Sequence, residues 1–101
     1  MSSDVIVTTL PSLTHAVFVE EKGLIMGSSY AAILPTDSMV TARNMEAAQK
    51  SAVDYLKTLA ERLGANAILG LRIERVNLGT FVDVLAYGTA ARVTFQQGVY
   101  R

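Results

Sequence analysis

The sequence has no cysteine, no excess of charge of either sign and no long apolar run. Without cysteine the chain can form neither a disulfide nor a thiolate metal site. Nine basic residues balance nine acidic ones, so the concentrated positive face that a nucleic-acid backbone requires is not expected. The first four residues lack the basic and apolar regions of a signal peptide, and no stretch is apolar enough to span a bilayer. The sequence therefore predicts a cytoplasmic protein that binds neither nucleic acid nor membranes.

Half of the 101 residues are hydrophobic and only 18% are charged, a high apolar content for so short a chain. A chain of this length buries about two-thirds of its unfolded surface and supports one core, so residues 1–101 are expected to form a single domain. High hydrophobicity with low charge excludes a disordered chain. The composition thus predicts a folded domain with apolar surface to spare.

The longest periodic segment predicts one amphipathic helix over residues 38–63. Ser38 is the expected N-cap, and Gly64 suits the left-handed position that ends a helix. Residues 27–37 are rich in small and turn residues and are expected to form the connection before the helix. Apolar residues recur along the helix in steps of three and four, which defines one buried stripe: Met45, Ala48, Ala52, Leu56, Leu59 and Leu63.

Four segments predict β-strands: 5–9, 15–27, 67–76 and 81–95. The second is interpreted as one long strand with a bulge at Gly23, and a hairpin turning at residues 21–23 is the alternative. A turn at 77–80 joins the last two strands as a hairpin. The helix and the strand 67–76 have similar lengths, about 39 Å and 33 Å, so they can run antiparallel along their whole extent. The predicted fold class is α+β, a small antiparallel sheet of about three main strands plus a short N-terminal strand, packed on one long helix.

The last strand has two apolar or small faces, which is typical of a strand covered on both sides. One face carries Val82, Val84, Ala86, Gly88 and Ala90, and the other carries Leu85, Tyr87, Thr89, Ala91, Val93 and Phe95. One helix covers only one face of such a sheet. Further copies of the chain are the simplest cover for the other face, and the segments 5–9 and 96–101 could add strands to a neighbour's sheet.

No group of residues predicts a catalytic, cofactor or metal site. His15 is the only histidine, and a zinc site needs three or four ligands, so a surface histidine is the favoured interpretation. A ring of subunits could still place one His15 from each copy around its axis. Glu20 and Glu21 point to opposite faces of a strand and cannot chelate one ion together. Gly64 and Gly70 follow a helix and lie within a strand, the wrong order for a phosphate loop, so they are interpreted as a helix cap and a close-approach site.

Four stretches match a known family in order and spacing. They are Thr-Thr-Leu-Pro-Ser-Leu at 8–13, Gly-Leu-Ile-Met-Gly at 23–27, Leu-Gly-Ala-Asn-Ala-Ile-Leu-Gly-Leu-Arg-Ile at 63–73 and Gly-Thr-Ala-Ala-Arg-Val at 88–93. Together they resemble the YbjQ family, whose members are labelled heavy-metal-binding domains. The resemblance implies a dodecin-like α/β subunit assembled as a ring-shaped homopentamer of unknown biochemical function. The chain departs from the family in its short segment 28–37, which lacks a second helix and an Arg-Ser-Gly-Ala-Tyr stretch.

The residues predict a homo-oligomer that is not an enzyme, needs no cofactor and has itself as its main partner, and the resemblance implies that this oligomer is ring-forming and pentameric. The alternative is a module that binds a small ligand or a metal ion between subunits or on the ring axis.

Overall fold

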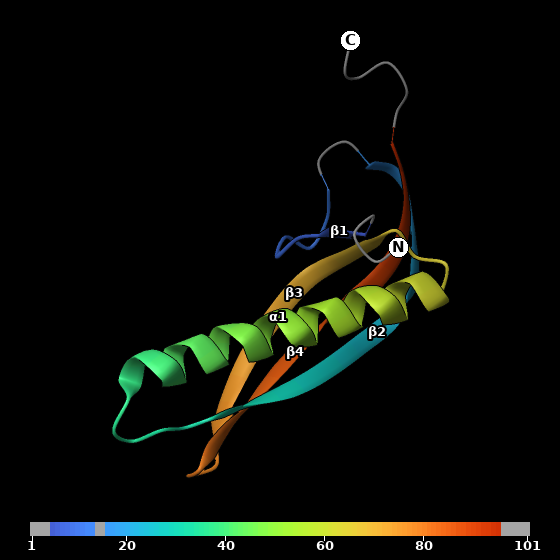
Figure 1. The fold of residues 1–101 in the computed structure, drawn as a ribbon. Coiled ribbons are helices and arrows are strands. Elements are labelled where there is room, and N and C mark those ends of the chain that lie inside the picture. Colours follow the sequence, from blue (N-terminus) through green and yellow to red (C-terminus); the bar gives the residue numbers. More distant parts are fainter. Residues whose placement is uncertain (1–4, 14–15, 96–101) are drawn as a thin grey trace.

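The computed structural model describes residues 5–13 and 16–95, which place one helix on one face of a four-stranded sheet (Figure 1). The elements are β1 (Ile6–Val7), β2 (Ala16–Ala32), α1 (Ser38–Arg62), β3 (Ala67–Asn77) and β4 (Phe81–Phe95). The strand order across the sheet is β1-β3-β4-β2. The α+β class, with three main strands and a short N-terminal strand, is confirmed.

Strand β4 lies between β3 and β2 and pairs antiparallel with both. The predicted turn between β3 and β4 is confirmed: Leu78 N donates to Phe81 O at 2.9 Å, and Gly79 adopts a positive φ of 100°. Strand β1 adds to β3 in parallel, with Ile6 opposite Ala67. The segment 5–9 therefore pairs with its own sheet rather than with a neighbour's.

Strand β2 is one continuous strand of 17 residues, so the bulged strand was the correct alternative and the hairpin was not. Its register shifts between Glu21 and Gly23, and Gly23 has a φ of 130°. The predicted connection from residue 27 is wrong at its start, because residues 28–32 continue β2 and pair with β4 as far as Phe81. The neighbouring strand β4 offers backbone hydrogen-bond partners along its whole length. Residues 28–32 take up these partners because a buried backbone group without a partner is costly.

Helix α1 begins at Ser38, but its N-cap is Asp37, whose Oδ1 accepts a hydrogen bond from Val40 N at 3.1 Å. The prediction of Ser38 as the cap is therefore wrong by one residue. The end of the helix is as predicted: Gly64 has a φ of 78°, and Ala65 N donates back to Ala60 O at 2.9 Å. Its buried residues are Ala48, Ala52, Leu56 and Ala60.

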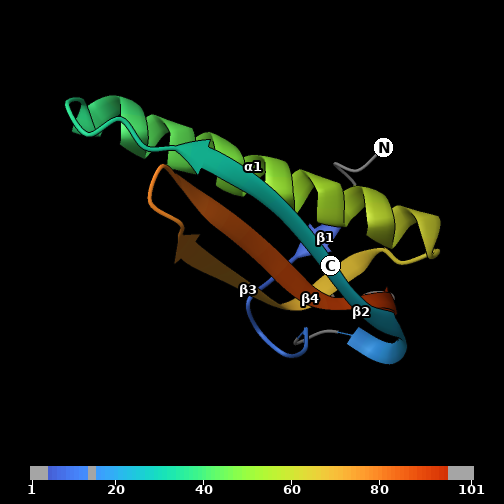
Figure 2. The ribbon, with the colours of Figure 1, turned by 90° about the horizontal axis from the view of Figure 1, so that it is seen from below.

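The helix packs mainly on β2, less on β4 and least on β3. The packing of the helix along the strand 67–76, which the matching lengths allowed, is therefore not found. Gly27 of β2 gives the physical reason, since a Cβ atom there would lie 3.0 Å from Ala52 O of the helix backbone. The missing side chain lets the helix approach β2 closely. Figure 2 shows the helix on one side of the sheet and no helix on the other.

Two glycines at the β3–β4 pairing have different roles. Gly70 has a φ of 64° and open space around its Cα, and it lies in the register shift between Leu69 and Arg72. Its prediction as a close-approach site is wrong, because it supplies the left-handed backbone of a β-bulge. The close approach is at Gly88, where a Cβ would lie 2.9 Å from Ile68 Cγ2 and 3.0 Å from Leu69 O.

Candidate functional site: an uncovered sheet face and a free strand edge

The sheet has an inner face under α1 and an outer face on the opposite side (Figures 1 and 2). The strand pairing sets which side chains share the outer face, because residues opposite each other point to the same side. Leu24 lies opposite Thr89, Met26 opposite Tyr87 and Tyr30 opposite Asp83. From β3 the outer face receives Arg72, Glu74 and Val76, which lie opposite Tyr87, Leu85 and Asp83.

Large apolar side chains of β2 stand exposed on this outer face. Leu24 is 84% exposed, Met26 59% and Tyr30 74%. The Tyr30 ring meets the Phe81 ring edge-on, with the ring centroids 5.7 Å apart. Soluble monomers rarely expose a row of such residues on one surface, so this face has the character of a contact surface.

One end of the outer face is covered by the chain itself. Residues 8–10 extend β1 along β3, with Leu71 N donating to Thr8 O at 2.9 Å and Gly70 N donating to Leu10 O at 2.8 Å. Leu13 then packs against a buried cluster on this end of the sheet, formed by Ala67, Leu69, Ala91 and Val93. The expectation that the chain has no cover for its second face is therefore wrong at this end, whereas residues 5–13 and 16–95 supply no cover for the stretch from Leu24 to Tyr30.

A hollow of about 400 Å³ opens on the outer face where the bulges of β2 and β3 flank β4. Its polar lining includes Glu21, Arg72, Tyr87 and Thr89. The Tyr87 hydroxyl donates to Glu74 Oε2 at 2.5 Å. This hydrogen bond to a carboxylate raises the pKa of Tyr87, with a smaller contribution from desolvation and an opposing one from the Arg72 charge. The hollow combines both signs of charge with an apolar border, so it is not a site for one bare cation.

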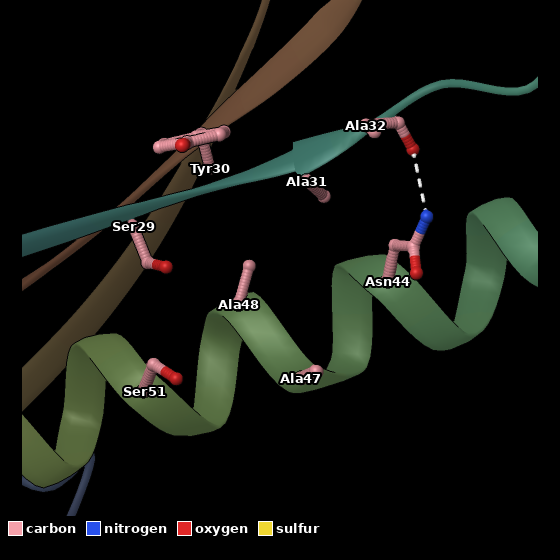
Figure 3. A pocket seen from close by; sticks show the side chains of 8 residues that line it. All are labelled: Ser29, Tyr30, Ala31, Ala32, Asn44, Ala47, Ala48 and Ser51. Atoms are coloured by element: carbon pink, nitrogen blue, oxygen red, sulfur yellow. Dashed lines mark hydrogen bonds between the residues drawn. The ribbon is translucent and has the colours of Figure 1, made fainter.

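The second surface is the outer edge of β2, which ends the sheet. A groove of about 370 Å³ runs between this edge and α1 (Figure 3). Asn44 Nδ2 donates to Ala32 O at 3.1 Å and closes one end of the groove. Tyr30 also lines the groove, and its other lining residues are small: Ser29, Ala31, Ala32, Ala47, Ala48 and Ser51.

The sequence candidates that lie within the described residues do not come together in a catalytic or metal site. His15 and the tail 96–101 lie outside the described residues. Glu20 forms an ion pair with Lys22 at 3.2 Å, whereas Glu21 lines the hollow on the outer face. Across residues 5–13 and 16–95, no three His, Cys, Asp or Glu side chains form a group that could hold a metal ion. In the same residues no charged or polar side chain is buried.

The sequence interpretation missed the Tyr87–Glu74 hydrogen bond and the groove beside β2. The first could have been found from the turn at 77–80, because the hairpin register brings residue 74 beside residues 85 and 87. The second had no local signal, since it depends on where the helix lies across the sheet.

Within the described part of the chain, no helix combines the length and apolarity needed to cross a membrane.

Comparison with known proteins finds relatives along most of the chain. Residues 33–94 match the model of the YbjQ family, whose description is "Putative heavy-metal-binding". A UPF0145 protein of Sulfurisphaera tokodaii is 28% identical over 106 residues, which cover 91% of this chain and 93% of that protein. A UPF0145 protein of Burkholderia orbicola is 33% identical over 92 residues, which cover 86% of this chain and 77% of the relative.

The fold also matches a solved structure. A crystal structure from Pediococcus pentosaceus, titled as a protein with unknown function of the DUF74 family, superposes with a TM-score of 0.74. The superposition covers 89% of this chain and 98% of that chain, with 20% sequence identity. At this identity the likeness shows the fold.

Proposed function

The chain belongs to the YbjQ family, and from that premise we propose that it is a self-assembling protein without catalytic activity, whose copies gather their outer faces around a common axis. The family resemblance favours a ring of five subunits. The same resemblance and the composition favour a cytoplasmic location.

The exposed apolar row on β2 supports this proposal most directly. Leu24, Met26 and Tyr30 are held in fixed positions by a strand paired along its length, yet they have no cover among the described residues. Burial of these side chains in a subunit contact would contribute about 25 cal/mol of favourable free energy per Å² of apolar surface. The lack of catalysis is supported by the absence, in residues 5–13 and 16–95, of any buried ionisable group of the kind that active sites use.

Light scattering after size-exclusion chromatography tests the assembly. We expect a mass that is a multiple of the 10.9 kDa chain, and five copies for the favoured ring. The double variant Leu24→Ser/Tyr30→Ser should shift the mass toward one chain with unchanged circular dichroism. Met39→Ser is the matched control, because Met39 is 66% exposed but lies on the helix, and its mass should stay at the parent value. A monomeric parent at micromolar concentration would refute the proposal.

The second candidate is a module that binds a small ligand or a metal ion between subunits or on the ring axis. Two observations favour it, the description of the family and the hollow beside Tyr87, whose charged groups would repeat around a ring. Calorimetric titration with divalent metal ions, on the parent and on His15→Ala, tests the metal form. Binding heats that vanish in His15→Ala would support a symmetric histidine site, and equal heats in both proteins would exclude His15.

A further inference from the structure

Assembly through the outer face does not use the free edges of the sheet, although a free edge is the part of a β-protein most ready to pair with another chain. The 17-residue strand β2 forms one edge. At the opposite edge, β1 and residues 8–10 cover β3 only up to Leu71. Within the described residues, no strand covers residues 73–77 of β3 on that side. The sheet therefore has two different free edges.

The two free edges lie at the same level of the sheet. Through their shared partner β4, residue Gly27 of β2 is level with Ile73 of β3, and Ala31 is level with Asn77. Both strands run antiparallel to β4 and hence parallel to each other. A second copy related by rotation about an axis along the strands would bring its β3 edge beside the β2 edge of the first, with both helices on the same side of the sheet. Such a head-to-tail contact joins different surfaces and can close into a ring.

The groove between β2 and α1 is suited to receive this strand. The flank of the helix above it carries Ala47 and Ser51, whose small side chains leave space beside the strand edge. The incoming strand needs a cover on its inner face, because its own helix scarcely contacts β3. On that face Asn77 is exposed and Ile73 is only half-buried, and Arg75 is exposed even though it donates to Gln49 Oε1 of its own helix at 3.0 Å. The side of helix α1 in one copy would thus cover the inner face of residues 73–77 in the next copy.

The bulges of β2 and β3 leave space for the other part of the incoming edge, which β1 and residues 8–10 form. The register shift of β2 after Glu21 and that of β3 after Leu69 lie opposite residues 87–91 of β4, at one level of the sheet. Bulges bend strands, and Figure 1 shows the first part of β2 running in a different direction from its second part. The first part of β2 is therefore turned aside at the level where a neighbour's β1 would lie.

We infer that residues 73–77 of one copy pair in parallel with the second half of β2 of the next copy, in the groove between β2 and α1. This inference rests on the proposed self-assembly and names the partner surface for it. The outer faces of successive copies then form one continuous surface that turns toward the ring axis.

Cysteine cross-linking tests the pairing cleanly, because the natural chain has no cysteine to interfere. Ser28→Cys places a thiol on the outer face of β2, and it is combined in turn with Arg72→Cys, Glu74→Cys and Val76→Cys on the outer face of β3. The three positions allow for a shift of the strands along each other, since a disulfide needs Cα atoms within about 4.4–6.8 Å. We expect at least one double variant to give, on mild oxidation, a ladder of linked chains that ends at the mass of the assembly. Ser28→Cys with Glu46→Cys, whose second thiol lies on the helix, is the control and should give no ladder.

The outcomes separate this inference from the assembly itself. A parent that assembles, with no ladder from any of the three pairs, overturns the edge pairing and leaves the assembly standing. Linked dimers from Ser28→Cys alone would overturn it as well, because they require two-fold contacts between identical edges. A monomeric parent overturns both.

Discussion

The inner and outer faces of the sheet are both apolar, but only the inner face has small residues that admit a helix beside its larger ones. Under the helix lie Gly27, Ala31 and Ala86 together with the buried Ile25, Val82 and Val84, whereas the uncovered face carries Leu24, Met26, Tyr30, Leu85 and Tyr87. Small residues let the helix backbone come close to the strands, as the 3.0 Å between a Cβ at Gly27 and Ala52 O demonstrates. Large residues on the other face form a surface that the described part of the chain covers only at one end.

The difference teaches that hydrophobicity alone does not identify the core of this chain. Among the described residues, the fully buried ones include several alanines, whereas Leu24, a large apolar residue, is 84% exposed. Burial here depends on where the helix can approach the sheet closely, which Gly27 permits on the inner face. A strand face that exposes large apolar residues is therefore a sign of a contact outside the chain.

The sharpest test of this difference is a pair of identical truncations, one on each side of the sheet. Leu56→Ala removes a fully buried side chain under the helix and should lower the free energy of unfolding by about 2–5 kcal/mol. Leu24→Ala removes a side chain that is 84% exposed and should change the stability of the single subunit by less than about 0.5 kcal/mol. Urea unfolding followed by circular dichroism measures both.

Protein concentration separates the two effects, because assembly adds stability only where copies associate. The unfolding midpoint of Leu56→Ala should fall at every concentration. That of Leu24→Ala should fall only at concentrations where the parent is assembled. If Leu24→Ala lowers the midpoint equally in dilute solution, Leu24 belongs to the core of the subunit and the contrast between the faces is lost.

The next test inserts a side chain where the inner face has none. Gly88→Leu should cost about 1–3 kcal/mol, because its Cβ would lie 2.9 Å from Ile68 Cγ2 and 3.0 Å from the backbone oxygen of Leu69. For a domain of about 100 residues, each kcal/mol lowers Tm by about 4–8 °C. Thr89→Leu, one residue along and facing outward, is the control and should keep the parent Tm. A Gly88→Leu protein with the Tm of the parent would show that the strands can move apart there.

The elements of this fold could be predicted because their signals are local. The period of apolar residues predicted α1, and Gly64 predicted its end. The turn residues at 77–80 predicted the hairpin of β3 and β4. In each case the cause lies within a few residues of the effect.

The arrangement of the elements could not be predicted in the same way. Residues 28–32 have turn-like composition, but their pairing with β4 makes them strand. The position of the helix over β2 depends on Gly27 facing Ala52, two residues far apart in the sequence. The hollow on the outer face needs two bulges at one level, which only the complete register reveals. The groove at the β2 edge arises from the same long-range geometry.

Helix α1 covers the inner face, so the hydrogen bond at its N-terminus should also contribute to stability, with a smaller expected effect. Asp37→Ala removes the side chain that accepts the hydrogen bond from Val40 N and should cost about 1 kcal/mol. Ser38→Ala, at the first residue of the helix, should cost less than about 0.5 kcal/mol. Thermal unfolding of both variants measures the difference. The reverse order would show that Ser38 is the cap.

The smallest expected effect concerns the polar part of the outer face. Because Glu74 raises the pKa of Tyr87, the folded chain holds the phenol proton more tightly than the unfolded chain, whose value is near 10.0. The stability from this hydrogen bond is therefore complete below pH 10 and is lost as the pH rises through the folded pKa. Tyr87→Phe cannot ionise, so the stability difference between parent and variant should be constant from pH about 8 to 10 and shrink above that. Urea midpoints over this range measure it.

Glu74→Gln sharpens the same prediction, because it keeps an acceptor for the Tyr87 hydroxyl and removes the carboxylate charge. The loss of stability should begin near pH 10 in both proteins, but in Glu74→Gln it should be smaller and end at a lower pH than in the parent, since a neutral acceptor raises the folded pKa of Tyr87 less. A difference between parent and Tyr87→Phe that stays flat across the whole range would mean that the hydrogen bond does not form in solution. The charged groups of the outer face would then act without the Tyr87–Glu74 link, and the contrast with the inner face would rest on the exposed apolar row of β2.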